Sequence, residues 1–389
     1  MIHLNIFYAA AGNIARHNLK SMIVVLCLSA ILVPFISALS ISEGTKKQSM
    51  ISVEQGADIY LTMDMYGRNG MIPAALSGEI EKIDGVTEAV PRVIGRIYVE
   101  GRLAVLLGLP EKRFASAAGF IDGPPPVRDG IVIGKGLAES LGLRTGSDLS
   151  IGVRIFAILE HVPYIQKKVY TVSGIFDAES SIWTSSLILM DIEEAIAMFE
   201  MEGFVSDIAV YVQPGHTQQV VESIQKMNSF FRVQTKGTAM TYMERGFNTK
   251  NGVFASLYTL AFAVAIPLVL MLSGFGLSER RKEVGILKAT GWHTHEVLEM
   301  VFYENLVLSL IAASFSYVLS FIWVRLLNGA FISRIFIPGI ESMSSFPVPA
   351  EFSGMQLFLS FFVSLVLTMS GSIYPAWRTA VIPPAEAVR

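Results

Sequence analysis

Few residues in this sequence have types and spacing that could do chemistry. Gly134-Lys135-Gly136 places a lysine between two glycines. A phosphate-binding loop requires Gly-x-x-x-x-Gly-Lys followed by Ser or Thr, and that pattern does not occur. The Gly-x-Ser-x-Gly and His-Glu-x-x-His patterns of hydrolases are absent too. We therefore expect no catalytic residue in this chain and no ATP hydrolysis by the chain itself.

The histidines do not form a recognisable metal site. One cysteine, Cys27, lies in an apolar run, so no intrachain disulfide can form. The sequence has six histidines: His3, His17, His161, His216, His293 and His295. None of them clusters with Cys or acidic residues at the spacing of metal ligands. His293 and His295 are close in sequence, but two residues apart on a helix they would point to different sides. A zinc site there is a weak hypothesis, because no further ligands are evident, and we expect no metal.

The densest group of charges near apolar runs is the 278–292 segment, SERRKEVGILKATGW. In a helix, Val284 and Leu287 would lie one turn apart on an apolar strip, and Arg281 and Lys288 would form a basic strip. Gly291 would then end the helix. The alternative is an ordinary cytoplasmic loop, since such loops are rich in Lys and Arg.

Long apolar runs flank this segment and predict a membrane protein. Of 389 residues, 52% are hydrophobic and 16% charged, whereas soluble domains average about 25% charged residues. Four runs are long enough for helices that cross a bilayer: residues 21–42, and runs near 252–278, 300–324 and 353–376. Pro34 and Pro267 are tolerated kinks. A cleaved signal peptide is the alternative for the first run, which is longer than the apolar part of such peptides.

The charge pattern predicts orientation and excludes two classes of protein. Arg16, Lys20, the basic residues of the 278–292 segment and Arg378 lie in short loops or termini, which favours the cytoplasm for both termini. Residues 1–20 are expected to form a cytoplasmic helix in the membrane interface. A net charge of -3 argues against nucleic-acid binding. The uncharged stretches 21–42, 251–278, 305–324 and 352–377 carry no Asp, Glu, Lys, Arg or His, which disfavours a gradient-driven carrier.

Residues 43–250 alternate between apolar and polar positions and are punctuated by turns, which predicts one large extracytoplasmic α+β domain. Strands are expected at 58–62, 93–99, 103–107, 130–133, 169–176, 186–190 and 208–212, and helices at 76–83, 136–141, 192–201 and 218–228. The polar, glycine-bearing stretch 63–70 is expected to be a mobile loop. The predicted fold class is therefore an α-helical membrane protein with four transmembrane helices and this domain inserted between the first and second.

Small residues recur at helical spacing in the last two runs. Such stripes let the backbones of membrane helices approach closely, within one subunit or between subunits, although membrane helices are generally rich in small residues. The expected packing positions are Ala312, Ser316, Ser320, Ser360, Ser364, Thr368 and Ser372.

Several of these segments together resemble FtsX/MacB-type ABC transporter permeases. The 279–291 sequence ERRKEVGILKATG resembles the segment after the second helix of that family, and the 374–389 sequence YPAWRTAVIPPAEAVR its usual carboxyl terminus. GADIY at 56–60, GIVIGKGLAESLGLRTGSD at 130–148 and YTVSGIF at 170–176 look like the MacB-like periplasmic core domain. NIARHNLKS at 13–21 is similar to the entry to the first helix, and residues 251–389 would form the FtsX-like permease domain.

The resemblance implies a permease subunit that works as a dimer with a second permease subunit, which could be a copy of itself or a related chain. It also implies separate ABC ATP-binding subunits, which would hold ATP and magnesium, and a location of the permease in the cell membrane. An accessory envelope protein is a further candidate partner. The residues that would dock on the ATPase are Arg280, Arg281, Glu283, Gly285, Ile286, Leu287, Lys288 and Gly291.

The function predicted is coupling of ATP hydrolysis in the partner to motion of the outer domain, for export or extraction of a substrate. Two alternatives stay open: a membrane receptor that signals through a recruited partner, and an envelope scaffold that regulates a partner such as a hydrolase without transport.

Overall fold

The structure, a computed structural model, describes residues 2–100, 102–116, 121–126, 129–156, 164–274, 277–336 and 347–381. The chain divides into two compact units. The first, here called the helical unit, comprises Met1–Gly44, Asn248–Phe336 and Ala350–Arg389. The second, called the mixed unit, comprises Thr45–Phe247 and Ile337–Pro349. The predicted carboxyl-terminal motif lies outside the described residues beyond Val381.

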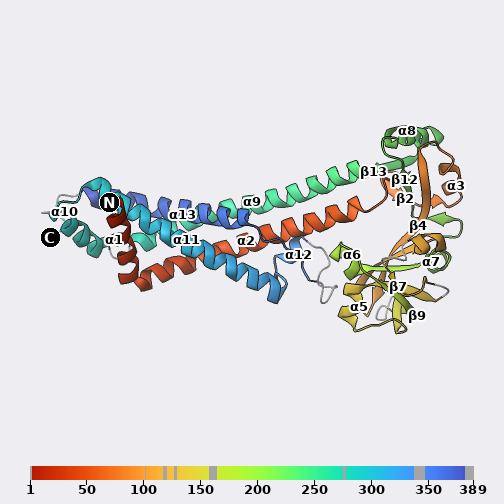
Figure 1. Cartoon of the computed structure of the whole chain (residues 1–389), viewed down its shortest axis with the longest axis horizontal. Helices are drawn as coiled ribbons and strands as arrows, with labels where there is room; N and C mark the ends of the chain where they lie inside the picture. Colours follow the sequence, from red (N-terminus) through yellow and green to blue (C-terminus); the bar gives the residue numbers. More distant parts are fainter. Residues whose placement is uncertain are drawn as a thin grey trace. The chain divides into compact units, whose positions relative to one another are not determined.

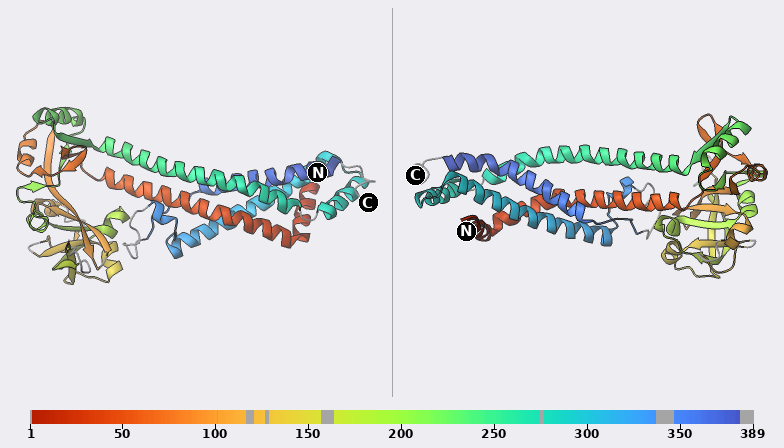
Figure 2. Two further views of the ribbon diagram at one scale, coloured as in Figure 1. Left: turned by 180° about the vertical axis from the view of Figure 1, so that it is seen from behind. Right: turned by 45° about the horizontal axis from the view of Figure 1, so that its top comes forward.

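Long helices make up the helical unit. In chain order they are α1 (Ile2–Arg16), α2 (Asn18–Glu54), α9 (Lys236–Gly274), α10 (Leu277–Ala289), α11 (Thr294–Leu327), the short α12 (Ser333–Phe336) and α13 (Gly354–Val381). Within this unit α2, α11 and α13 lie side by side, and α1 and α10 are at the same end (Figures 1 and 2). Pro34, Pro267 and Pro375 are all accommodated inside helices.

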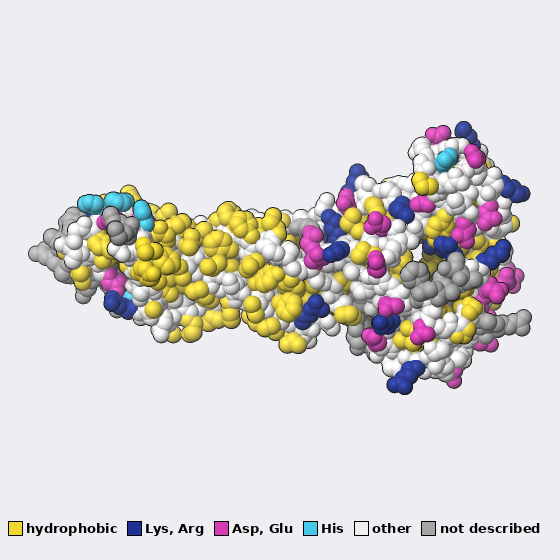
Figure 3. Space-filling view, viewed as in Figure 1, with side chains coloured by type: hydrophobic (Ala, Val, Ile, Leu, Met, Phe, Trp, Pro, Cys, Tyr) yellow, Lys and Arg dark blue, Asp and Glu magenta, His cyan; other side chains and the backbone are white. Residues whose placement is uncertain are grey.

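On the face of the helical unit seen in Figure 3, hydrophobic side chains are frequent along most of its length and charged ones are few. On α11, for example, Leu310 and Val318 are 53% and 56% exposed, whereas Ser309 and Ser316 are fully buried. This inversion of the pattern of soluble helices is expected where lipid surrounds the bundle. The unit therefore has the character of a membrane protein.

Among the described residues three helices are long and apolar enough to cross a membrane: Asn18–Glu54, Thr294–Leu327 and Gly354–Arg378. They contain the runs predicted at 21–42, 300–324 and 353–376. The fourth run, near 252–278, lies in α9 up to Gly274. The count of four spans thus stays a prediction.

The helices α2 and α9 extend well beyond the predicted spans. α2 continues to Glu54 and α9 begins at Lys236, whereas the sequence placed residues 43–58 and 235–250 in an undivided globular region. The two extensions carry charged and polar residues, and this composition hides a helix from a search for apolar runs.

The mixed unit is built on one large sheet. Its described strands are β1 (Ile59–Met65), β2 (Arg68–Gly70), β4 (Val86–Val99), β5 (Arg102–Leu109), β6 (Ile121–Asp122), β7 (Gly130–Gly134), β8 (Asp148–Phe156), β9 (Tyr164–Phe176), β10 (Leu187–Asp191), β12 (Asp207–Val212) and β13 (Phe231–Thr235). Their order is β13-β1-β12-β4-β5-β10-β7-β9-β6, with β2 on β1, and β8 on β4 and β9. β3 (Ile72–Pro73) pairs with β11 (Phe204–Val205).

Helices pack against this sheet, and their apolar side chains form the core of the mixed unit together with those of the strands. The helices are α3 (Leu76–Ile80), α4 (Glu111–Ser116), α5 (Lys135–Leu141), α6 (Ser181–Ser186), α7 (Ile192–Phe199) and α8 (Thr217–Met227). Ile59 and Leu61, alternate residues of β1, are fully buried, and so are Val220 and Ile224 of α8. Because successive side chains of a strand point to opposite faces, the other face of β1 carries Tyr60 and Thr62. The α+β prediction is confirmed.

All the predicted strands and helices of the mixed unit are present, with shifted ends. The largest shift is in β4, which begins at Val86 instead of residue 93. Its first half contains Pro91 and reads as a turn, but it pairs with β12. The elements that were not predicted are β2, β3, β6, β8, β11, β13, α4 and α6. β13 is a short edge strand in which only Phe231 is buried.

The expectation of a mobile loop at 63–70 is wrong. β1 and β2 form a hairpin in which Met65 pairs with Arg68. Tyr66 and Gly67 have φ of 53° and 84°, as a two-residue turn of this kind requires. The Asp64 carboxylate accepts a hydrogen bond from the Gly67 amide over 3.0 Å.

Candidate functional site

The 278–292 segment forms a capped helix. α10 spans Leu277–Ala289, and the chain then turns at Gly291, which has a φ of 101°. The Trp292 amide donates to the Leu287 carbonyl over 3.1 Å, and the Gly291 amide donates to the Lys288 carbonyl over 3.1 Å. These two bonds satisfy carbonyls that the helix end would leave free. Gly291 therefore ends the helix as the sequence predicts.

One face of α10 is built into the helical unit. Val284 is 5% exposed and packs with Val297 and Ala380. Leu287 contacts a cluster that contains Ile6, Ala10 and Met300, and Gly285 is buried. These contacts fix the helix against α1, α11 and α13.

Polar contacts hold the same face. Lys288 donates from Nζ to the Ala380 carbonyl over 2.6 Å, and Thr294 donates to the same oxygen over 3.3 Å. His17 Nε2 lies 3.2 Å from Glu283 Oε1. Lys288 thus contacts the end of α13, and Glu283 contacts His17 just before α2.

Part of the surface of α10 is exposed. Ile286 is 60% exposed, although its neighbours in sequence are buried or half-buried. The side chains of Arg280 and Arg281, also predicted to contact a partner, lie outside the described side chains. Of the eight predicted docking residues, Ile286 is the one whose described side chain is large, apolar and mostly exposed, and it also lines the same cavity as Val284 and Leu287.

α1 is tied to α11 at the same end of the unit. His3 contacts Glu299 through Nδ1, and Asn13 donates from Nδ2 to Glu304 Oε1 over 2.6 Å. The Glu304 residue is 5% exposed. Asn13 lies in the 13–21 segment quoted above for its resemblance, but no local signal in the sequence indicated that it contacts Glu304.

A cavity of about 430 Å³ lies between α1, α10, α11 and α13. Its walls are mainly apolar, with Asn13, Arg16 and Glu283 as the polar exceptions.

The predicted small-residue stripes are buried inside the helical unit. Ala312, Ser316 and Ser320 of α11 and Ser360 and Ser364 of α13 are all fully buried. Ser316 donates to Ser29 Oγ over 3.0 Å and Ser320 to the Val33 carbonyl over 2.9 Å, so these two meet α2.

Thr368 and Ser372 of α13 meet α11 instead. Thr368 lies 3.0 Å from Ser309 Oγ, and Ser372 accepts a bond of 2.7 Å from Asn305 Nδ2. Ser309 and Asn305 were not predicted, although they continue the spacing of Ala312 and Ser316 toward the start of α11. The stripes therefore serve contacts between helices of one chain.

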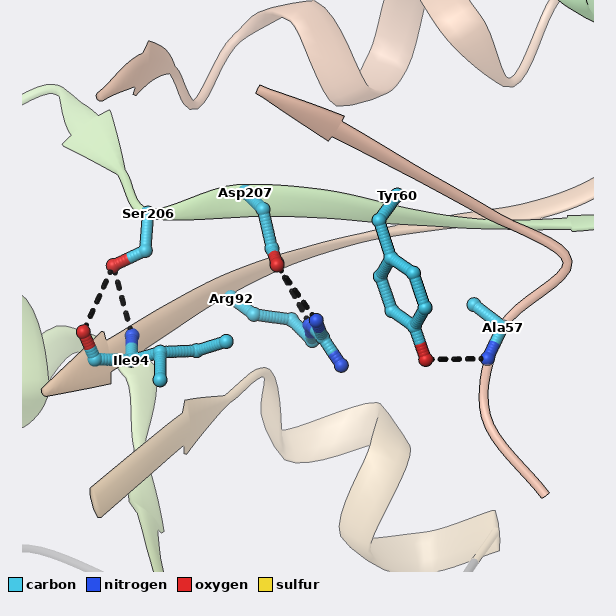
Figure 4. A network of polar contacts seen from close by, with 6 residues as sticks. All are labelled: Ala57, Tyr60, Arg92, Ile94, Ser206 and Asp207. Atoms are coloured by element: carbon cyan, nitrogen blue, oxygen red, sulfur yellow. Dashed lines mark hydrogen bonds and ion pairs between the residues drawn. The ribbon is translucent and has the colours of Figure 1, made fainter. Parts of the chain in front are cut away.

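A second polar site lies in the mixed unit, on the face of the sheet opposite the apolar core (Figure 4). Arg92 of β4 donates from Nε and Nη2 to the two carboxylate oxygens of Asp207 over 2.8 and 2.7 Å. Its guanidinium lies 4.7 Å from the centre of the Tyr60 ring. Tyr60 in turn accepts a hydrogen bond of 2.9 Å from the Ala57 amide. Burial lowers the pKa of Arg92, but the bond to Asp207 and the nearby negative charge raise it above its ordinary value.

This network borders a cleft of about 520 Å³, which also contacts Arg232 of β13 and Tyr242 of α9. Side chains of β1, β4, β12 and β13 that face away from the core form its floor. The charges of Arg92 and Asp207 are mutually compensated, so the network acts as a brace between strands.

The histidines give one correction. His293 and His295 do not point to different sides, because His293 has extended backbone (φ −86°, ψ 158°) and precedes α11 instead of lying in it. Their ring centres are 5.6 Å apart. In the part of the chain that the structure describes, no group of three His, Cys, Asp or Glu residues could hold a metal ion.

Two protein-family models match the chain. The model of the MacB-like periplasmic core domain matches residues 21–227, and that of the FtsX-like permease C-terminal region matches residues 255–384. Together they include most of α2, most of the mixed unit, part of α9, and all of α10, α11 and α13.

Single proteins are similar at low identity. The lipoprotein-releasing system transmembrane protein LolC of Xylella fastidiosa is 19% identical over 279 residues, 70% of this chain and 67% of that protein. An uncharacterized ABC transporter permease protein of Mycobacterium tuberculosis is 23% identical over 286 residues, 72% of this chain and 31% of that protein. The crystal structure of the periplasmic region of MacB from Actinobacillus actinomycetemcomitans matches at 12% identity and a TM-score of 0.34, over 50% of this chain and 98% of that one.

Proposed function

Because this chain belongs to the FtsX/MacB-type family of ABC transporter permeases, we propose that it couples ATP hydrolysis in a separate subunit to movement of its mixed unit. The work done is export or extraction of a substrate. The relative LolC is named as part of a lipoprotein-releasing system, so a lipid-anchored protein is the first substrate class to test.

The observation that carries the proposal is the setting of α10. Its inner face is held by Val284, Leu287 and Lys288 against three other helices, while Ile286 is mostly exposed. A push on the exposed part of α10 would therefore reach α1, α11 and α13 together. This is what a docking helix for a motor subunit needs.

The partners follow from the same proposal. An ABC ATP-binding subunit docks on α10 around Ile286 and supplies both the ATP site and its magnesium. A second permease subunit completes the complex, with the ATP-binding subunits on the side of α1 and α10. The permease itself performs no hydrolysis.

We place the protein in the cell membrane, with the mixed unit outside and both termini in the cytoplasm. Lys and Arg near helix ends favour the cytoplasm, and α10 and the region around Arg16 carry them. α9 is the fourth span in this arrangement. An even number of spans then leaves residues 45–247 on the outer side.

Affinity purification of the tagged, detergent-solubilised protein tests the proposal. We expect an ABC ATP-binding subunit to co-purify and to show ATPase activity that depends on the permease. Recovery of the permease without such a subunit, together with no stimulated activity on adding one, would disprove it.

The docking surface is tested by Ile286→Glu, which places a charge on the exposed part of α10. We expect loss of the ATP-binding subunit from the purified complex, and the same from charge reversal of Arg281 or from Gly285→Trp. Leu19→Glu is the matched control, because Leu19 is 64% exposed but lies on α2. Equal retention of the subunit by Ile286→Glu and Leu19→Glu would contradict the assignment.

A further inference from the structure

The two long helices enter the mixed unit at neighbouring points. α2 ends at Glu54 and leads into β1, and β13 leads directly into α9 at Lys236. β1 and β13 are adjacent and antiparallel, with Ile59 opposite Thr235. The end of α2 and the start of α9 are therefore held beside the same two strands.

One lysine joins these two helix ends. Lys236, the first residue of α9, donates from Nζ to the Glu54 carbonyl over 3.0 Å and lies 3.3 Å from Asp58 Oδ1. Its backbone amide donates to the Asp58 carbonyl over 2.8 Å. The second carboxylate oxygen of Asp58 accepts from the Val212 amide over 2.9 Å. Lys236 and Asp58 thus connect α2, α9, β1 and the end of β12, and we call this pair the clasp.

The link between α2 and β1 has little freedom to bend. The Gly56 amide donates to the Val53 carbonyl over 3.2 Å, and the Ala57 amide donates to the Tyr60 hydroxyl over 2.9 Å. A Cβ on Gly56 would lie 2.2 Å from that hydroxyl oxygen, so only glycine fits while Tyr60 keeps this position. The Tyr60 ring also lies beside the bonded pair Arg92 and Asp207.

We propose that the clasp positions α2 and α9 so that they act on the sheet as one body, which deepens and rests on the proposed coupling function. α2 and α9 are continuous helices with residues in both units. Without the clasp, α2 and α9 can each turn or slide independently. The displacement of either helix is then lost in the link at its end and does not reach the sheet. With the clasp, displacement of the pair is passed to β1 and β13. The clasp gives Asp58 of the GADIY sequence a role, and the turn beside it does the same for Gly56 and Tyr60.

The first test needs no partner. In a background with Cys27→Ser, spin labels at Lys46→Cys on α2 and Glu244→Cys on α9 report the distance between two positions of the mixed unit. We expect a single narrow distribution in the parent protein and in Lys236→Arg, and a broadened distribution in Lys236→Met. An equally narrow distribution in Lys236→Met overturns the inference.

The second test uses the complex with its ATP-binding subunit. Labels at Glu222→Cys and Leu326→Cys report movement between the mixed and helical units when ATP is added. We expect Lys236→Met to lose the ATP-driven change in distance while the complex still assembles and hydrolyses ATP, and Lys236→Arg to keep the change. Lys135→Met, which removes an exposed ion pair with Asp177 elsewhere in the unit, is the control and keeps it.

The two tests separate the two ideas. An unchanged ATP-driven movement in Lys236→Met, or its loss in Lys236→Arg and Lys135→Met as well, overturns the clasp as a positioning device. Absence of an ATP-driven movement in the parent complex contradicts the proposed function, and in that case the distribution between Lys46 and Glu244 still decides whether the clasp holds α2 to α9.

Discussion

Asn13 donates a hydrogen bond from Nδ2 to Glu304 Oε1 over 2.6 Å, although 291 positions separate the two residues. Glu304 lies on α11 and is almost fully buried, whereas Asn13 is on the last turn of α1. A buried carboxylate requires hydrogen-bond donors, because removal from water is otherwise unfavourable. The bond therefore anchors the amino-terminal helix beside α10.

We expect Asn13→Ala to destabilise the helical unit, because Glu304 loses a donor in a buried position. Loss of one partner of a buried polar group costs about 1–3 kcal/mol. Unfolding of the purified protein in detergent, followed by tryptophan fluorescence, measures this loss. Asn5→Ala is the control, since Asn5 is an exposed residue of the same helix. Equal stabilities of the two variants would show that the bond contributes nothing.

Gly291→Ala is expected to loosen the end of α10. A side chain at a φ of 101° is strained by about 1–3 kcal/mol, and relief of this strain breaks the bonds from Gly291 and Trp292 that close the helix. Hydrogen exchange of the amides of residues 290–292 should therefore become faster. Gly252→Ala is the matched control, because that glycine is helical and has open space around its Cα. Unchanged exchange in Gly291→Ala would mean that the cap does not depend on glycine.

Local signals in the sequence predicted where helices and strands form better than they predicted which of these elements contact one another. The apolar runs of α2, α11 and α13 and the stop at Gly291 depend on neighbouring residues only, so periodicity and residue type reveal them. The same is true of the small-residue stripe that includes Ala312 and Ser316.

Contacts between distant segments left no such signal. The bond between Asn13 and Glu304 depends on how α1 packs on α11, and the clasp of Asp58 and Lys236 depends on β1 pairing with β13. β13 itself was missed although its residues alternate, because a strand of five residues with one buried side chain gives only a weak local signal. His293 was misread because the start of α11 could not be placed to the residue.

Arg92→Met should strongly destabilise the mixed unit. The side chains of Arg92 and Asp207 are 17% and 12% exposed, and removing one partner of a buried ion pair costs about 3–5 kcal/mol. Chemical denaturation followed by circular dichroism tests this. The double variant Arg92→Met with Asp207→Leu should lose less stability than Arg92→Met alone, because no unpaired carboxylate remains. A larger loss in the double variant would contradict the brace, and Lys135→Met, at an exposed pair, should change little.

Tyr170 makes the stability of the mixed unit sensitive to alkaline pH. Burial raises the pKa of the Tyr170 hydroxyl from 10.0 to about 12, and the hydroxyl donates to Glu194 over 3.2 Å. Because the folded-state pKa is raised, this contribution to stability is fully present below pH 10 and is lost as pH rises toward 12. Lys168 is adjacent, with its ammonium 4.9 Å from the Tyr170 ring centre, and it pairs with Glu194 and Asp129.

We therefore expect Tyr170→Phe to flatten the decline of unfolding free energy between pH 10 and pH 12, because Phe has no hydroxyl to ionise on unfolding. Denaturation curves at a series of pH values measure the slope. Tyr66→Phe is the control, since Tyr66 is fully exposed and its ring meets solvent in both states. The decline of unfolding free energy with pH is assigned to Tyr170 only if Tyr170→Phe reduces its slope and Tyr66→Phe does not. Identical slopes in the parent and both variants would assign the loss of stability at alkaline pH to other groups, with Lys168 the first to test.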